Sequence, residues 1–281
     1  MNRSCLTTTI IAGAAFGLSA AAALAGPLMD RINAGEAIRI GFANEIPFAY
    51  PGPDGSPKGF VNAETLGVLK KMGHENIEAV QTDWGGLIPG LQAGRFDIIT
   101  GGMNILASRC ENIAFSEPMA KIGDAFIVAA GNPKGLTTYV DIKDKGAVMV
   151  TGSGYSNIEA AKAAGVEEAN IMQVPGPTEI LAAVKAGRAD AGAGTYFTVK
   201  QLADSTGGEL EVTDPAALPE DSINWAGIGF RKEDQDFLDA FNAAQKGYLG
   251  TPEMMEAVKE YGYGEPTLPG DVTTEWVCAN R

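Results

Sequence analysis

An arginine lies just beyond the end of a predicted strand, a position suited to binding an anion. Arg109 and Asn104 follow a strand expected over residues 96–100 and a turn that contains Gly101 and Gly102. In an open α/β sheet, ligands bind outside the carboxyl ends of the strands. The planar fork of an arginine suits a carboxylate, which it grips at two points. Taken alone, Arg109 is more simply explained as a surface arginine after a turn, so the rest of the chain must decide.

Two further segments carry candidate binding residues at strand ends. The strand expected over residues 37–43 stops at Pro47, which lacks the amide hydrogen that a strand ladder needs. Glu45 and Phe48 therefore lie at another carboxyl end. Trp84 precedes two glycines in a loop between a strand and a helix, where its ring would cover a ligand or pack in the core with equal ease.

The loop Thr151 to Ser156 (TGSGYS) leads from a strand expected over residues 147–150 into a helix that begins at about Asn157. Glycines and hydroxyl groups before a helix offer free backbone N–H groups and the positive end of the helix dipole, which favour an anion. An ordinary helix start explains the loop equally well. A phosphate-binding loop is excluded, because no Lys-Ser/Thr pair follows at the required spacing.

The first 25 residues have the composition of a secretory signal peptide. Arg3 precedes an apolar run from Thr9 to Leu24, and a small-residue cleavage site ends at Ala25. We expect cleavage after Ala25 and a periplasmic location. Cys5 precedes the apolar run and should leave with the signal peptide. No later segment has the roughly 18 consecutive apolar residues that a membrane-spanning helix needs.

The charge balance excludes some classes of partner. The chain has 21 basic and 35 acidic residues, and removing Arg3 with the signal peptide leaves 20 against 35, a net charge of −15. Such an acidic chain is a poor partner for nucleic acid or anionic lipid. The hydrophobic fraction of 45% indicates a fully folded globular chain, and the remaining length suffices for two domains.

Two cysteines remain in the mature chain, Cys110 and Cys278. An even pair in an exported chain predicts a disulfide, the alternative being two buried thiols. The disulfide would tie the turn after Arg109 to the C-terminal tail. Closing so long a loop is worth about 4–5 kcal/mol by loop-closure estimates.

A pattern recurs in the two halves of the chain. Residues 88–100 and 180–195 both contain a predicted helix, the sequence Ala-Gly-Arg-x-Asp and then a predicted strand. The glycine is suited to end the helix. Two such units suggest two lobes of similar architecture, although the recurrence of good helix-stop residues would give the same pattern.

Several motifs resemble the extracytoplasmic solute-binding proteins of ABC importers, in their polar amino-acid branch. They are MNILASRCENIAFSEPM (103–119), GLIPGLQAGRFDIITGGM (86–103) and YGYG near Tyr261. Within that branch the chain is most similar to ectoine- and hydroxyectoine-binding proteins, through ANEIPF (43–48) and GNPKGLTTYVDI (131–142). The resemblance extends over nearly the whole mature chain.

The resemblance assigns roles to the candidate residues. Arg109 matches the arginine that clamps the ligand carboxylate, and Glu45 matches the acid that meets the cationic nitrogens of ectoine. Phe48 matches one aromatic wall, and Trp84 stands where the family has a tyrosine. A delocalised cation is attracted to each aromatic face by roughly 0.5–2 kcal/mol. These implied roles suit a compact zwitterion.

Three positions depart from the family pattern. Asn104 stands where a third aromatic wall is expected, and Tyr155 is an addition to the loop before the helix. Common amino-acid binders place an aspartate at the position of Thr195 to hold the α-ammonium group. Its absence argues against an ordinary α-amino acid and shifts the cation to Glu45.

The resemblance also implies the fold and the mechanism. We expect an α/β protein with the two lobes of a type II-like periplasmic binding protein: residues 26–130 with 224–281, and residues 131–223, joined by a hinge near Gly131 and Ser222. The first lobe would bind the solute through the residues named above, and the second would close over it with Gly154, Tyr155, Ser156 and Thr195. We expect a monomer without cofactor that works with the permease subunits of the importer.

Other functions need consideration. A binding protein for a polar amino acid is the main alternative, and a dehydratase on the same fold would use Glu45 as a general acid. A soluble partner of a sensor kinase is a third possibility. His74 has no nucleophile near it in the pattern. No His/Cys cluster suggests a metal, and Asp141 with Asp144 is better explained as a solvated turn.

Overall fold

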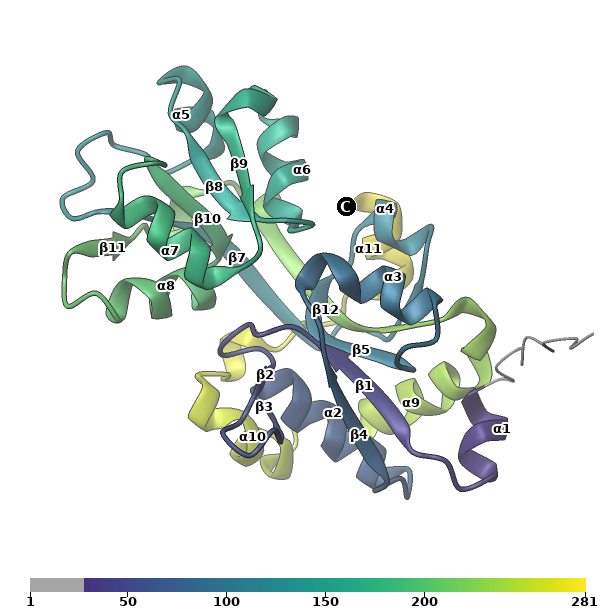
Figure 1. Cartoon of the computed structure of the whole chain (residues 1–281). Coiled ribbons are helices and arrows are strands. Elements are labelled where there is room, and N and C mark those ends of the chain that lie inside the picture. The colour runs from purple at the N-terminus through teal and green to yellow at the C-terminus, as the bar shows by residue number, and fades with distance from the viewer. Residues whose placement is uncertain (1–27) are drawn as a thin grey trace, which may run out of the picture.

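The computed structural model describes residues 28–281, which form two α/β lobes joined by two long strands, β7 (Ala120–Ala129) and β12 (Ile223–Phe230) (Figure 1). The expected fold class is confirmed. The predicted signal peptide and its cleavage site at Ala25 lie outside the described residues. Between Leu28 and Arg281, none of the helices combines the length and the apolar character needed to cross a bilayer.

The first lobe is built on a sheet with strand order β4-β1-β5-β12. Strand β1 runs parallel to β4 and β5, and β12 runs antiparallel to β5. Its strands are β1 (Ile38–Phe42), β4 (Ile77–Gln81) and β5 (Ile98–Asn104), with the short β2 (Tyr50–Pro51), β3 (Pro57–Lys58) and β6 (Ala114–Phe115). Its helices are α1 (Leu28–Asn33), α2 (Phe60–Lys71), α3 (Leu87–Gln92), α4 (Ala107–Cys110), α9 (Gln235–Tyr248), α10 (Pro252–Val258) and α11 (Thr274–Asn280).

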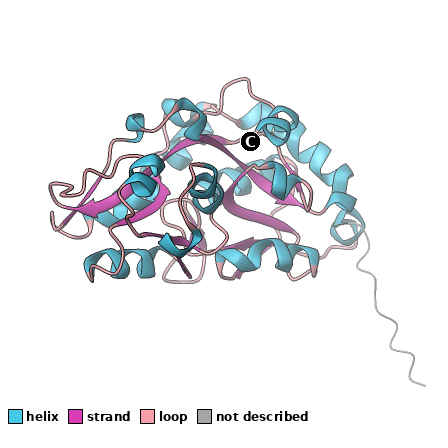
Figure 2. Cartoon of the chain, turned by 90° about the horizontal axis from the view of Figure 1, so that it is seen from above, coloured by secondary structure: helices cyan, strands magenta, loops and turns pink. Residues whose placement is uncertain are grey.

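The second lobe continues from β7 with the order β7-β10-β8-β9, and β11 pairs with β7. Helices cover both faces of the strands (Figure 2). The strands are β8 (Met149–Gly152), β9 (Ile171–Val174), β10 (Ala191–Thr195) and β11 (Leu210–Val212). The helices are α5 (Tyr139–Asp144), α6 (Ser156–Ala163), α7 (Pro177–Lys185) and α8 (Tyr196–Asp204).

Strand β7 exchanges partners within its length. Its first part pairs with β12, ending at Gly123 opposite Ile223, and its second part pairs with β10, beginning at Asp124 opposite Thr195. The exchange thus lies upstream of Gly131, the crossing point that the sequence suggested. The second connection returns to the first sheet where β12 begins.

The repeated Ala-Gly-Arg-x-Asp pattern occupies the same place in each lobe. Gly94 and Gly187 have left-handed φ values of 68° and 64°, which end the preceding helices. In the first lobe, the Arg39 N–H donates to Oδ2 of Asp97 at 2.9 Å. In the second, the Val148 N–H donates to Oδ2 of Asp190 at 3.0 Å. Each aspartate therefore holds the start of a neighbouring strand.

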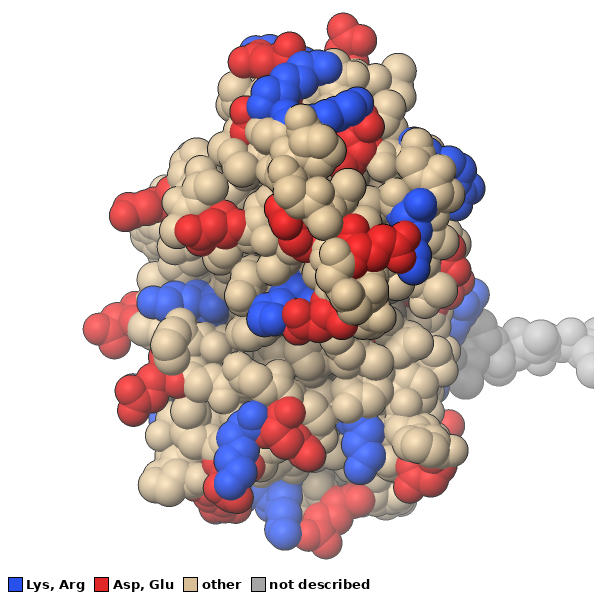
Figure 3. Space-filling view, turned by 90° about the vertical axis from the view of Figure 1, so that its left-hand side faces the viewer, with Lys and Arg blue, Asp and Glu red and all other residues tan. Residues whose placement is uncertain are grey.

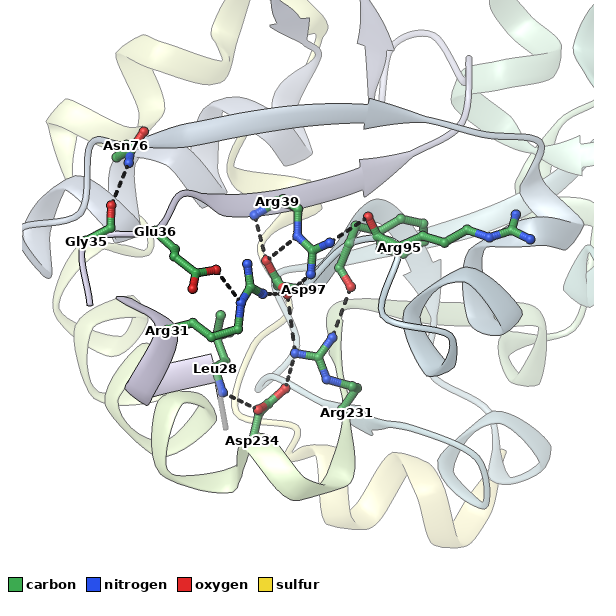
Figure 4. Close-up of polar contacts among 11 residues, drawn as sticks. Leu28, Arg31, Gly35, Glu36, Arg39, Asn76, Arg95, Asp97, Arg231 and Asp234 are labelled. Carbon is green, nitrogen blue, oxygen red and sulfur yellow. Dashed lines mark hydrogen bonds and ion pairs between the residues drawn. The ribbon is translucent and has the colours of Figure 1, made fainter. Parts of the chain in front are cut away.

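Asp97 is also the centre of a buried ion cluster (Figure 4). Its side chain has no solvent exposure, and its Oδ1 lies 2.6 Å from Nη1 of Arg31, 2.8 Å from Nη2 of Arg39 and 3.4 Å from Nη2 of Arg231. Burial alone would raise the pKa of Asp97, but hydrogen bonds and charge from Arg39 and Arg31 hold it below its ordinary value. The cluster joins α1, β1, the residue before β5 and the residue after β12.

Charged side chains of the surface are mixed in sign. On the face shown in Figure 3, acidic and basic groups alternate, without a large area of one sign. Exposed pairs such as Lys71 with Glu253 at 2.7 Å are typical. Pairs of this kind contribute little to stability because water screens both partners.

The predicted disulfide between Cys110 and Cys278 is present. It links α4 to α11, so a sequence separation of 168 residues is closed by one bond. Helix α4 carries Arg109, and the disulfide therefore fixes the element that positions this side chain.

Replacing Asp97 with asparagine should destabilise the protein by about 3–5 kcal/mol, because three arginines lose their shared buried anion. Urea unfolding of Asp97→Asn against the wild type measures the loss. Glu253→Gln breaks an exposed ion pair and should change stability by less than about 1 kcal/mol. Equal, small effects of both substitutions would show that the cluster is unimportant.

Removing the disulfide in a Cys110→Ala/Cys278→Ala variant should cost about 5 kcal/mol, since the unfolded chain gains the freedom of a very long loop. The melting temperature of this variant, compared with that of the oxidised wild type, tests the expected loss. A melting temperature that does not change would contradict a stabilising role for this bond.

Candidate functional site

A small cavity lies between the lobes and collects most of the residues expected to bind a ligand. Seven of the nine line it: Glu45, Phe48, Trp84, Asn104, Tyr155, Ser156 and Thr195. Gly101, Gly102, Asn157 and Thr198 complete the wall. Arg109 and Gly154 do not line the cavity, but they bond to each other beside it.

Glu45 is held at the end of β1 by a tight turn. Its N–H and C=O groups bond to the backbone of Ala49 at 2.8 and 3.0 Å, which turns the carboxylate into the space between the lobes. The side chain is 5% exposed and accepts a hydrogen bond from the hydroxyl of Tyr155 in the second lobe. Burial raises the pKa of Glu45 from 4.5 to about 7, and the Tyr155 bond offsets part of the rise. The hydrogen bond to its carboxylate comes from an uncharged group.

Arg109 projects from α4 and is 7% exposed. Its Nη1 donates to the carbonyl of Asn104 at 2.7 Å, and its Nη2 donates to the carbonyl of Gly154 at 2.8 Å. Burial lowers the pKa of Arg109 to about 10, and the charge of Glu159 opposes this shift. The guanidinium remains a cation at neutral pH, held by dipoles and not by a carboxylate in hydrogen-bond contact.

Two consecutive residues of the second lobe thus bond to the two buried charged groups of the first. The carbonyl of Gly154 accepts from Arg109 and also from Nε1 of Trp84 at 3.2 Å. Gly154 has a left-handed φ of 80°, a conformation that favours glycine. Gly152 gives room to the ring of Tyr155, because a Cβ at Gly152 would overlap that ring.

Two amide groups of the loop that the sequence suggested as an anion site have backbone partners. The N–H of Ser153 donates to Val174 at 2.8 Å, and that of Tyr155 donates to Gly152 at 3.0 Å. Tyr155 and Ser156 of this loop line the cavity, and the carbonyl of Gly154 lies beside it on Arg109.

Aromatic rings enclose the cavity from both lobes. The Trp84 ring lies 5.3 Å from the Tyr155 ring in an edge-to-face arrangement. Phe48 packs on Phe60 at 4.8 Å and near Phe197 at 6.3 Å. Tyr155 therefore adds an aromatic wall from the second lobe in a cavity where Asn104 is polar.

Asn104 links the lobes and keeps one free acceptor. Its Nδ2 donates to Oγ of Ser156 at 2.9 Å. Its Oδ1 is buried and accepts no hydrogen bond from the residues described between positions 28 and 281. A buried acceptor left unpaired costs free energy, so a donor from a bound molecule would be stabilising here.

Four wall residues are not identifiable as binding candidates from the sequence: Gly101, Gly102, Asn157 and Thr198. Gly102 is recognisable only as part of a turn, yet a Cβ there would overlap the Phe48 ring, and its φ is 70°. Asn157 is recognisable only as a helix start. Thr198 lies on α8, a helix that the sequence does not suggest, and bonds to the Thr195 hydroxyl at 3.1 Å.

The cavity is closed to anything larger than a few atoms. Its volume is about 30 Å³, and one water needs roughly 10–15 Å³ of such space. A groove of about 200 Å³ adjoins it and shares Glu45 and Trp84 in its lining, which also carries the acids Asp83 and Glu179 and no basic residue. An amino-acid-sized molecule therefore does not fit the cavity while the contacts between the lobes are made.

No group of three His, Cys, Asp or Glu side chains within residues 28–281 is arranged to hold a metal ion.

The profile of a family described as bacterial extracellular solute-binding proteins, family 3, matches residues 38–264. A probable amino-acid ABC transporter periplasmic-binding protein of Sinorhizobium fredii is 34% identical over 276 residues, 95% of this chain and 91% of that protein. The L-cystine-binding protein TcyJ of Escherichia coli is 26% identical, with 77% and 79% of the two chains covered.

Solved structures give the same picture. EhuB in complex with hydroxyectoine superposes with a TM-score of 0.82 at 28% identity and covers 90% of this chain and 98% of EhuB. The ancestral amino-acid-binding protein AncCDT-1, named as a precursor of cyclohexadienyl dehydratase, has a TM-score of 0.72 at 25% identity, with 83% and 98% covered.

Titration of Glu45 should make the stability of the protein depend on pH. Because its folded pKa lies above 4.5, its stabilising contribution is complete below pH 4.5 and is lost as pH rises through about 7. Glu45→Gln should therefore match the wild type at pH 4.5 and exceed it at pH 8 by on the order of 3 kcal/mol. Urea unfolding at both pH values measures this, and an equal difference at both would contradict it.

Proposed function

Because the chain belongs to family 3 of the bacterial extracellular solute-binding proteins, we propose that its inter-lobe cavity captures a small zwitterion of the ectoine or hydroxyectoine type. The protein is a periplasmic solute-binding protein of an ABC importer, a class that delivers solutes to membrane permease subunits. The identity of the solute, its binding residues and the monomeric state are the proposed parts.

One observation carries the proposal. Glu45 and Arg109 are buried opposite charges of the same lobe, and neither meets an opposite charge among its hydrogen-bond partners. Dipoles of Gly154 and Tyr155 compensate them only in part, since isolated buried charges are costly. A zwitterion would supply a cation to Glu45 and a carboxylate to Arg109 in a single binding event.

The rings support a cation with delocalised charge. Phe48 and Trp84 line the cavity near Glu45, and Tyr155 adds a third ring from the opposite lobe. Each such ring attracts a cation by roughly 0.5–2 kcal/mol. The likeness to a hydroxyectoine-bound protein agrees with this chemistry.

Binding is proposed to proceed by closure. The first lobe, residues 26–130 with 224–281, binds the solute through Glu45, Phe48, Trp84 and Arg109. The second lobe, residues 131–223, then closes with Gly154, Tyr155, Ser156 and Thr195. A solute favours the closed state only if it contacts both lobes. The strand pairing supports placing the first hinge at Gly123 and Asp124, slightly before the predicted boundary.

A polar amino acid is the second candidate. The unpaired Oδ1 of Asn104 would accept a hydrogen bond from an ammonium group, a role that Thr195 fills only weakly. The acidic groove next to Glu45 would accommodate a longer side chain. The names of several relatives refer to amino-acid binding.

We propose that the protein is not an enzyme. The likeness to a precursor of a dehydratase shows that the fold is compatible with catalysis. Glu45 is the acid that such a reaction would use, but its carboxylate is engaged by Tyr155. Absence of turnover with cyclic keto acids would agree with a binding protein.

Arg109→Ala should weaken hydroxyectoine binding at least about thirtyfold, because Glu45 would remain satisfied while the ligand carboxylate lost its partner. Calorimetric titration measures the change, after a thermal-shift panel of ectoine, hydroxyectoine, betaines and polar amino acids has ranked the solutes. Arg95→Ala, which replaces an arginine outside the cavity wall, should leave the affinity unchanged. An unchanged affinity in Arg109→Ala would contradict the proposed binding site. A polar amino acid that stabilises the protein more than the other solutes of the panel would favour the second candidate.

A further inference from the structure

A buried carboxylate, Asp124, lies at the point where β7 leaves the sheet of one lobe and enters the sheet of the other. Gly123 pairs with Ile223 in the first sheet, and Asp124 pairs with Thr195 in the second. The side chain is 3% exposed, and burial raises the pKa of Asp124 to about 7. The binding mechanism described above does not use this group.

The two oxygens of Asp124 contact different parts of the molecule. Oδ1 accepts a hydrogen bond at 3.0 Å from Nδ2 of Asn224, on the other connecting strand. Oδ2 accepts one at 2.9 Å from the hydroxyl of Tyr139, on α5. The carboxylate thus joins both connections between the lobes to a helix of the second lobe.

Tyr139 carries this contact on to the cavity. Its hydroxyl accepts a hydrogen bond at 2.8 Å from Nδ2 of Asn157, which is the second residue of α6 and lines the cavity. The two preceding residues make the contacts across the cleft, Tyr155 with Glu45 and Ser156 with Asn104. A continuous chain of buried hydrogen bonds therefore runs from the hinge strands to the loop that closes the site.

We propose that Asp124 is a positioning residue for lobe closure, which acts through Tyr139 and Asn157 to hold the start of α6 where Tyr155 and Ser156 meet the first lobe. Each group in this chain is buried, so a missing partner would leave a polar atom unsatisfied. The chain thereby favours one orientation of the loop relative to the hinge. This inference rests on the proposed function, because it concerns the closure by which a solute is held.

Two substitutions interrupt the chain with little change in volume. Asp124→Asn keeps an oxygen for Asn224 and places an amide, which does not accept, beside the Tyr139 hydroxyl. Tyr139→Phe removes that hydroxyl. In the protein without solute, hydrogen–deuterium exchange of residues 155–163 should become about tenfold faster in each variant. The double variant should be no faster than the faster single one, since both break one chain.

Binding gives a second readout. Both variants should bind hydroxyectoine about tenfold more weakly, because the closed state loses the stabilisation of its closing loop. Tyr263→Phe is the matched control: it removes a buried tyrosine hydroxyl that bonds to Met119 at 2.6 Å in the first lobe. This variant should leave both the exchange at residues 155–163 and the affinity unchanged.

The exchange experiment decides the proposal without a ligand. Unchanged exchange at residues 155–163 in Asp124→Asn and Tyr139→Phe would overturn it, as would acceleration spread evenly over the second lobe, which a purely structural role predicts. If the wild-type protein does not bind hydroxyectoine, the proposed solute fails, and the exchange rates still decide whether Asp124 positions the closing loop.

Discussion

Everything at the site depends on two opposite charges that are buried in the same lobe without an opposite charge in hydrogen-bond contact. A carboxylate in such surroundings resists ionisation, and a guanidinium keeps its charge at a cost. The structure offsets these costs with neutral partners from the other lobe, a phenol for Glu45 and a carbonyl for Arg109. We propose that these neutral partners give way to the charged groups of a solute, because charge-assisted hydrogen bonds are the stronger kind. The neutral partners thus stabilise the two buried groups without a solute, and the charged groups of a solute would replace them.

Hydrogen bonds, a disulfide and a cluster of ion pairs hold Glu45, Arg109 and their sheet in place. Glu45 lies in a turn in which its N–H and C=O groups both bond to the backbone of Ala49. Arg109 lies on a short helix that the disulfide joins to the C-terminal helix. At the far end of the same sheet, Asp97 ties the strands together through three arginines. The connecting strands carry Asp124 and Asn224, and Asp124 also bonds to Tyr139 of the second lobe.

The parts of this picture that depend on local patterns are predictable from the sequence. The β-forming residues of 37–43 predict a strand that the structure has as β1 (Ile38–Phe42), and the position of Glu45 after this strand places it at the cleft. Thr138 and Asp141 form a capping box that begins α5, where the sequence favoured a solvated turn for Asp141. The start of α8, Tyr196 and Phe197, consists of residues common in strands, and the sequence does not predict that helix.

Other features required the assembled molecule. No local pattern in the sequence predicts that Tyr155 contacts Glu45, 110 residues away in the chain, or that Arg109 donates to the carbonyl of Gly154. These contacts depend on the approach of two lobes and on the left-handed backbone of one glycine. The sequence accordingly identifies most of the residues of the cavity, but not the hydrogen bonds that the second lobe makes to Glu45 and Arg109.

A crystal structure of the protein grown with hydroxyectoine tests the central claim most directly. We expect the solute carboxylate to lie within hydrogen-bond distance of the Arg109 guanidinium, and its cationic nitrogens to contact Glu45 in place of the Tyr155 hydroxyl. A complex in which Gly154 and Tyr155 keep both contacts while the solute lies elsewhere would contradict the claim.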